Sequence, residues 1–140
     1  MLDHTSILFP VVALATLTFA VLMLIPVRRF RAGAAGQVKF DDFAYGESAR
    51  VPAEVSLPNR NMMNLLELPV LFYVACLTYY VTDSVNGVGL ALAWTYVALR
   101  VAHSAIHVSY NRVRHRLFAF AASNLVLISL WTNLLRTLSA

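Results

Sequence analysis

Residues 5–27 read TSILFPVVALATLTFAVLMLIPV and carry no charge over 23 positions. A helix of ~20 mostly apolar residues crosses the hydrocarbon core of a membrane, and lipid offers the backbone no hydrogen-bonding partner outside the helix. The stretch therefore predicts a membrane-spanning helix. Three later segments meet or approach this length, so we expect four spans, at residues 5–27, 62–82, 87–109 and 117–135.

The composition of the 140 residues agrees with a membrane protein. Hydrophobic residues make up 59% and charged residues 13%, against ~45–50% and ~25% in average soluble proteins. So few charges exclude a soluble domain and a disordered chain, and the single cysteine, Cys76, excludes a disulfide scaffold. We therefore predict one four-span domain over residues 1–140, in an all-α integral membrane fold.

The basic residues predict the orientation of the spans. Connector 28–61 holds six Lys and Arg residues and the connector before the last span holds three more, whereas the opposite side has only Arg136. Because basic loops stay in the cytoplasm, we expect both termini outside and both basic loops inside, in a bacterial inner membrane. The basic loops explain the net charge of +4 without nucleic acid, and they attract anionic membrane lipid.

Polar side chains inside the spans are costly in lipid and mark candidate functional sites. In the second span Arg60, Asn64 and Glu67 lie four and three positions apart, which puts them on one helix face. In the third span five polar residues follow at the same steps: Tyr96, Arg100, His103, His107 and Tyr110. Two polar stripes of this kind indicate a binding site between the two helices.

A short turn near residues 82–87 makes these two spans antiparallel neighbours, so residues at equal distance from the turn face each other. Three pairs then share a depth: Glu67 with Arg100, Asn64 with His103, and Arg60 with His107. We expect Glu67 and Arg100 to form an ion pair, because either charge alone is costly in the membrane. These three facing pairs suit a ligand that is zwitterionic with a net negative charge, because arginines bind carboxylates and Glu67 accepts an ammonium group.

The same polar residues are compatible with other functions. His103 and His107 have the spacing of metal ligands, but no HExxH motif or cysteine partner accompanies them, so we expect no metal. A small proton-coupled transporter would use Glu67 as its proton carrier. A non-catalytic membrane trimer would hold lipid or a partner helix instead.

The pattern Arg60-x-x-x-Asn64-x-x-Glu67, closely followed by Pro69, resembles the second-helix signature of the MAPEG family. These are the membrane-associated proteins in eicosanoid and glutathione metabolism. Arg100-Val101-Ala102-His103 and the later Arg116 continue the resemblance, which covers essentially the whole chain. It implies a four-helix bundle that assembles as a homotrimer. It also implies a glutathione transferase or peroxidase, in which glutathione binds between subunits near the cytoplasm and its thiolate attacks a lipophilic electrophile or hydroperoxide.

The resemblance also implies roles for individual residues. It implies a glutathione site lined by Arg60, Asn64, Glu67, Arg100 and His103, with Arg28 contributed by the adjacent subunit. It implies that Arg116 stabilises the thiolate. The sequence departs from the family at His107, because the family's transferases usually have a tyrosine there. The nearest tyrosine is Tyr110, a further candidate for binding, and His107 is a candidate either as a donor to sulfur or as a base.

Overall fold

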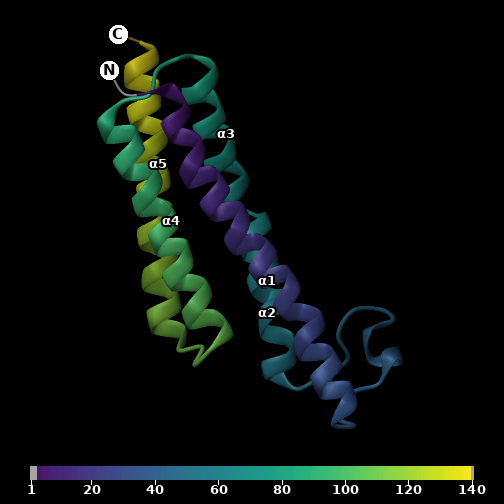
Figure 1. Ribbon diagram of the computed structural model, residues 1–140. Coiled ribbons are helices and arrows are strands. Elements are labelled where there is room, and N and C mark those ends of the chain that lie inside the picture. Colours follow the sequence, from purple (N-terminus) through teal and green to yellow (C-terminus); the bar gives the residue numbers. More distant parts are fainter. Residues whose placement is uncertain (1–2, 140) are drawn as a thin grey trace.

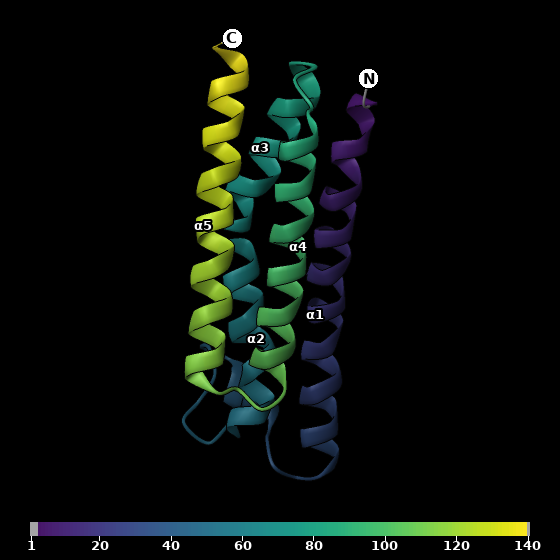
Figure 2. The same cartoon turned by 90° about the vertical axis from the view of Figure 1, so that its left-hand side faces the viewer.

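The computed structural model describes residues 3–139, which form two short 3-10 turns and five α-helices. The turns are η1 (His4–Ile7) and η2 (Phe40–Phe43), and the helices are α1 (Leu8–Ala34), α2 (Ala53–Leu66), α3 (Pro69–Val81), α4 (Gly87–Val108) and α5 (Val113–Leu138). The helices α2 and α3 follow one another along a single broken rod, so the molecule is a bundle of four rods with both termini at one end (Figures 1 and 2). The predicted all-α bundle is confirmed.

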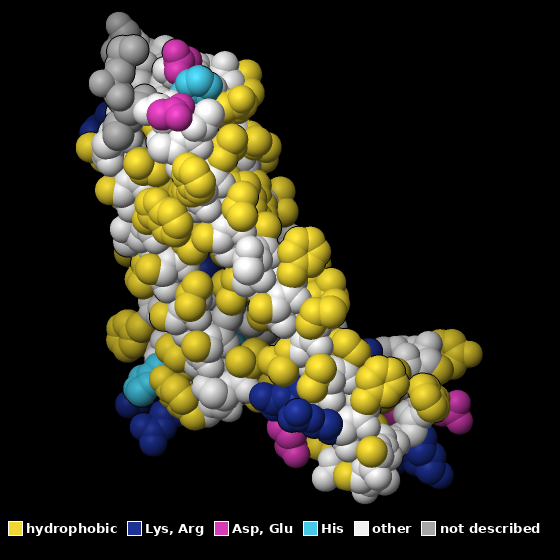
Figure 3. All heavy atoms as spheres, in the orientation of Figure 1, with side chains coloured by type: hydrophobic (Ala, Val, Ile, Leu, Met, Phe, Trp, Pro, Cys, Tyr) yellow, Lys and Arg dark blue, Asp and Glu magenta, His cyan; other side chains and the backbone are white. Residues whose placement is uncertain are grey.

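Three of the rods are long and apolar enough to cross a membrane: His4–Ala34, Ala53–Val81 and Val113–Leu138. The fourth rod, α4, carries Arg100, His103 and His107, and all three are buried inside the bundle. Large apolar side chains such as Phe9 and Phe118 are instead exposed on the outer surface, which is broadly hydrophobic in Figure 3. This inverted distribution is that of an integral membrane protein.

The connector between the first two rods is shorter than the expected 28–61, because α1 continues to Ala34 and α2 already begins at Ala53. The end of α1 is set by Gly36, which has a φ of 71°. The N–H of Gly36 donates to the carbonyl of Gly33 and that of Gln37 to the carbonyl of Ala32, a Schellman motif that needs a left-handed residue at this position. Only residues 35–52 therefore form the irregular loop.

The break in the second rod follows from Pro69, which has no N–H to donate to the carbonyl one turn earlier. α2 ends at Leu66, and α3 restarts with Pro69 in its first position, where a missing N–H costs nothing. The expected span 62–82 is thus two helices. Toward the end opposite the termini, α1 and α2 diverge from α4 and α5 (Figure 1).

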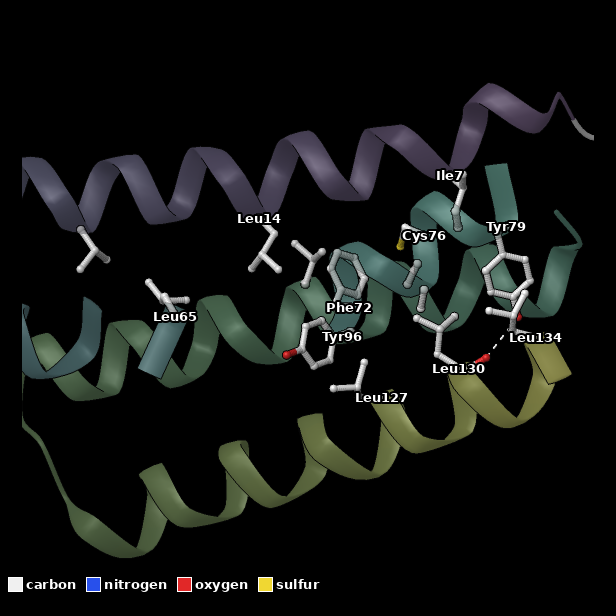
Figure 4. Packing of buried hydrophobic residues seen from close by; sticks show 14 residues of the cluster. Ile7, Leu14, Leu65, Phe72, Cys76, Tyr79, Tyr96, Leu127, Leu130 and Leu134 are labelled. Carbon is white, nitrogen blue, oxygen red and sulfur yellow. Dashed lines mark hydrogen bonds between the residues drawn. The ribbon is translucent and has the colours of Figure 1, made fainter. Parts of the chain in front are cut away.

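The apolar core occupies the half of the bundle that is nearer the termini. Figure 4 shows Phe72 of α3 stacked on Tyr96 of α4, with ring centroids 4.8 Å apart. The Tyr79 hydroxyl donates to the carbonyl of Leu130 at 3.2 Å, so even this buried tyrosine has a partner (Figure 4). The core fixes three rods around α4 and leaves the opposite end of the bundle to polar residues.

Candidate functional site

A pocket of about 350 Å³ lies between α2, α4 and α5, in the half of the bundle away from the termini. Its volume falls at the lower end of the ~300–1,000 Å³ typical of small-molecule sites. Eight residues line it: Arg60, Asn64, His103, His107, Val113, Arg116, Leu117 and Phe120. Five of these are residues that the sequence singled out, and two residues of each predicted stripe are among them.

The pocket is electrostatically one-sided. Arg60 and Arg116 line it, and no acidic side chain does. A third guanidinium, that of Arg100, lies close by, with its central carbon 6.0 Å from the ring centroid of the lining residue Phe120. Because like charges gathered in a cleft focus a positive potential, the pocket suits an anionic ligand.

Arg116 is held in a fixed position at the start of α5. Its Nη1 atom lies 3.2 Å from Nε2 of His107 and donates to Oδ1 of Asn111 at 2.8 Å. Asn111 has a φ of 45°, a left-handed conformation that asparagine tolerates better than most residues. The turn between α4 and α5 thereby aims the Asn111 amide back at Arg116.

The contact with Arg116 determines how His107 carries its proton. A guanidinium has only donors, so Nε2 of His107 must accept, which requires a neutral ring protonated on Nδ1. That Nδ1 atom is buried and has no hydrogen-bond partner among residues 3–139. The ring stacks on His103 with centroids 5.6 Å apart, and both ring nitrogens of His103 are also without a partner in the described chain. The pair therefore has unused hydrogen-bonding capacity beside the pocket.

Arg100 does not pair with Glu67, so that prediction was wrong. Its Nη2 atom donates to the backbone carbonyl of Asn64 at 2.7 Å. Asn64 belongs to the last turn of α2, where carbonyls lack helical partners, and the break before Pro69 leaves this one for Arg100. The expected register placed His103 opposite Asn64. The broken helix changes that register, and Glu67 is exposed.

The other atoms of the Arg100 guanidinium are unsatisfied. The side chain is fully buried, and neither Nε nor Nη1 has a hydrogen-bond partner within the described residues. None of the ion pairs found there involves Arg100. Because a buried charge without a counterion is costly, an anion that reached this guanidinium would be stabilised by it.

Arg28 lies outside the pocket and binds the backbone of its own chain. Its Nη1 atom donates to the carbonyl of Glu54 at 3.0 Å, and Nη2 donates to that of Val108 at 2.9 Å. Pro58, four residues after Glu54, has no N–H, so the Glu54 carbonyl has no partner inside α2. Val108 is the last residue of α4. Arg28 thus joins three helices through carbonyls that helix geometry leaves free.

Tyr110 does not face the pocket either. α4 ends at Val108, so the helical spacing that relates Tyr110 to His107 stops before it. Tyr110 is exposed, and its hydroxyl lies 3.2 Å from Nδ1 of His115. Sequence reasoning missed Asn111 and the apolar wall of Leu117 and Phe120. The wall had a signal in the sequence, because Leu117 lies four positions after Val113 and Phe120 follows three positions later, a spacing that puts all three on one helix face.

Comparison with known proteins identifies the family. The model of the MAPEG family matches residues 7–136, nearly the entire chain. The chain belongs to the MAPEG family. Curated proteins and solved structures gave no match. In this MAPEG protein, four of the five residues for which the sequence predicted a role in lining the site, Arg60, Asn64, Arg100 and His103, lie at or beside one pocket, and Glu67 does not.

Proposed function

We propose that this MAPEG protein binds glutathione in the pocket and transfers its thiolate to a lipophilic electrophile or hydroperoxide. The observation that carries the proposal is the Arg116 guanidinium, which is fixed by His107 and Asn111 at a pocket without acidic residues. A fixed cation favours the ionised form of a neighbouring thiol. Family membership supports the choice of glutathione among anionic thiols.

The polar end of the pocket suits the rest of the ligand. Glutathione carries two carboxylates, and guanidinium groups bind carboxylates through paired N–H donors. Arg60 lines the pocket, and Arg100 has unsatisfied N–H groups next to it. Asn64 offers both a donor and an acceptor. Glu67 is exposed on the outside of the single chain, so it receives the ligand's ammonium group only if glutathione lies between neighbouring subunits of a homotrimer.

The reaction begins when the thiol loses its proton to solvent, with Arg116 stabilising the remaining thiolate. In conjugation, sulfur forms a bond to an electrophilic carbon and the leaving group departs with its bonding electrons. With a hydroperoxide, sulfur attacks the terminal oxygen, the O–O bond breaks, and the alcohol leaves after protonation. A second glutathione then reduces the sulfenic acid to disulfide and water. Val113, Leu117 and Phe120 provide the apolar side for the lipophilic partner.

We assign His107 a positioning role. Its Nε2 lone pair faces the Arg116 donor, so that atom is not free to remove a proton from the thiol. His107 holds the guanidinium while the guanidinium acts on sulfur. The family's transferases usually have a tyrosine at this position. With a positioning role, His107 does not need to perform the function of the tyrosine hydroxyl.

We also propose an orientation for the site. The pocket contains Arg60 of α2 and Arg116 of α5, which lie in the parts of these helices that adjoin the two basic connectors, and basic connectors face the cytoplasm. The pocket then opens toward the cytoplasm, which supplies a water-soluble thiol, and both termini lie outside. The apolar co-substrate arrives through the surrounding lipid.

Turnover of purified protein in neutral detergent tests the proposal. Glutathione is supplied with an activated aryl chloride in one series and an organic hydroperoxide in the other, and loss of free thiol is followed against a protein-free control. We expect protein-dependent turnover that saturates with glutathione in at least one series. Saturable binding without turnover would favour the non-catalytic trimer, and absence of binding would contradict the proposed site.

A further inference from the structure

A second cleft lies outside the glutathione pocket, between the last turns of α1 and the loop that follows. Its volume is about 650 Å³. Much of its wall is apolar, and Ile25, Pro26, Phe30 and Phe43 contribute to it. The loop projects from the side of α1 that faces away from α4 and α5 (Figure 1), so this cleft opens on a different face of the bundle from the pocket.

The loop wall of the cleft is held in place by its own contacts. Val38 is buried against Ala32 of α1 and Val55 of α2 in a small second core. The Asp42 carboxylate accepts from the backbone N–H of Lys39 at 2.9 Å and from the Ser48 hydroxyl at 2.8 Å. Because both apolar packing and a buried carboxylate fix the loop, the cleft is preformed.

The position of the cleft along α1 matches the boundary between acyl chains and headgroups. With a rise of ~1.5 Å per residue, Ile25 lies about 25 Å and Ala34 about 39 Å along the helix from Leu8. A hydrocarbon core is ~30 Å thick, so the cleft spans the level at which it ends. Lys and Arg side chains gather at this end of the molecule beside exposed hydrophobic ones (Figure 3).

The charge at the cleft is positive and only partly neutralised. Arg29 lies 3.1 Å from Glu47 and its guanidinium carbon is 4.4 Å above the Phe43 ring, so its charge is already engaged. Lys39 also lines the cleft and is exposed, and it takes part in none of the ion pairs formed by residues 3–139. The apolar cleft, with the Lys39 ammonium group beside it, is complementary to an amphiphile with an anionic headgroup.

We propose that this cleft binds one anionic phospholipid of the leaflet that faces the basic loops. An acyl chain lies against Ile25 and Phe30, and the phosphate is held by Lys39. The lipid enters from the surrounding bilayer. The outer surface of α1 on the N-terminal side of the cleft is itself apolar and exposed, with Phe19 and Met23 66% and 57% exposed. This route needs no opening of the bundle and favours a lipid over a soluble partner.

Lipid titrations monitored by native mass spectrometry test the site, with phosphatidylglycerol and phosphatidylcholine of identical acyl chains as probes. A basic residue near the membrane surface contributes ~1 kcal/mol to anionic lipid binding, which corresponds to about five-fold. We expect phosphatidylglycerol to bind at least about five-fold more tightly, and Lys39→Gln to remove most of that preference. Arg114→Gln, a change in the first turn of α5 and outside the cleft, should leave it intact.

A cavity-filling variant tests the location. A Cβ atom at Gly33 meets no other atom within 4 Å, and Gly33 lines the cleft, so Gly33→Leu fills the cleft without a backbone clash. We expect it to weaken binding of both lipids at least ten-fold at unchanged helix content, and Ala34→Leu serves if it does not fold. Unchanged binding, or equal affinity of the wild type for both lipids, would overturn the proposal. So would a smaller assembly in Gly33→Leu, because a second copy would then fill the cleft.

Discussion

Nη1 of Arg116 lies 3.2 Å from Nε2 of His107 and 2.8 Å from Oδ1 of Asn111. One nitrogen of the guanidinium is therefore held from both sides, by the last turn of α4 and by the turn that follows it. The remaining N–H groups of the guanidinium form no hydrogen bond with the residues that the structure describes. This arrangement makes the position of the Arg116 charge depend on residues that do not need to touch sulfur.

Replacement of His107 should separate positioning from base catalysis. The amide oxygen of glutamine can take the place of Nε2 as an acceptor, so His107→Gln should keep most of the turnover. His107→Phe keeps ring packing on His103 but removes the acceptor, and we expect at least a ten-fold loss of kcat/KM with glutathione. Steady-state kinetics of both variants over a range of pH checks this.

The pH profile provides the contrast with a base. If His107 only positions Arg116, His107→Gln keeps a profile of the same shape as the wild type, because the thiol alone titrates. A wild-type profile with an additional acidic limb that disappears in His107→Gln would contradict the assignment and make His107 the base.

The sequence predicted the polar residues of the site better than their partners. The spacing of Arg60, Asn64, His103 and His107 was sufficient to bring them to one pocket, because the first two lie within α2 and the last two within α4. The pairing of Glu67 with Arg100 failed since a hairpin register assumes two unbroken helices, and α2 ends at Leu66.

Three further positions depended on information that spacing does not contain. Tyr110 follows the end of α4, so helical periodicity no longer applies to it. The role of Asn111 depends on a left-handed backbone conformation in a turn. Arg28 contacts Glu54 and Val108, which are distant in sequence, and the need for that contact is visible only as a missing N–H at Pro58.

A double-mutant cycle on Glu67 and Arg100 should now be nearly additive. Arg100 binds a backbone carbonyl and Glu67 is exposed, and exposed ion pairs contribute ~0–1 kcal/mol. We expect a coupling free energy below about 1 kcal/mol for Glu67→Gln with Arg100→Gln, measured by unfolding in mixed micelles. A coupling free energy of ~3 kcal/mol, typical of a buried ion pair that is broken, would show that Glu67 and Arg100 do form an ion pair.

Arg28 should stabilise the fold through its hydrogen bond to the Glu54 carbonyl, which has no partner inside α2 because Pro58 lacks an N–H. Hydrogen bonds to charged groups contribute ~1.5–3 kcal/mol, so we expect Arg28→Gln to lower the free energy of unfolding by about 2 kcal/mol. Pro58→Ala restores an N–H that can donate to the Glu54 carbonyl inside α2. The cost of Arg28→Gln should therefore be smaller by about 1 kcal/mol in the Pro58→Ala background, and an equal cost in both backgrounds would show that the Glu54 contact contributes nothing.

The loop that forms the lipid cleft should loosen in acid. Hydrogen bonds from the Lys39 backbone and the Ser48 hydroxyl, and the nearby Arg50, hold the pKa of Asp42 below its usual value of 3.8. The carboxylate therefore stabilises the loop above pH 3.8, and this contribution is lost as the pH falls through the lowered pKa. Protection factors of the amides in residues 35–52, which correct hydrogen exchange for the intrinsic rate at each pH, should fall there in the wild type, whereas Asp42→Asn should show low protection at every pH.

The most direct test of the account is the ultraviolet absorbance of the glutathione thiolate during a titration of the solubilised protein at neutral pH. The wild type should develop saturable thiolate absorbance, and Arg114→Gln, two residues away on the same helix, should do the same. Arg116→Ala should bind glutathione within about ten-fold of the wild-type affinity, measured by calorimetry, and form no excess thiolate. Equal thiolate absorbance in Arg116→Ala and the wild type would contradict the central role of Arg116.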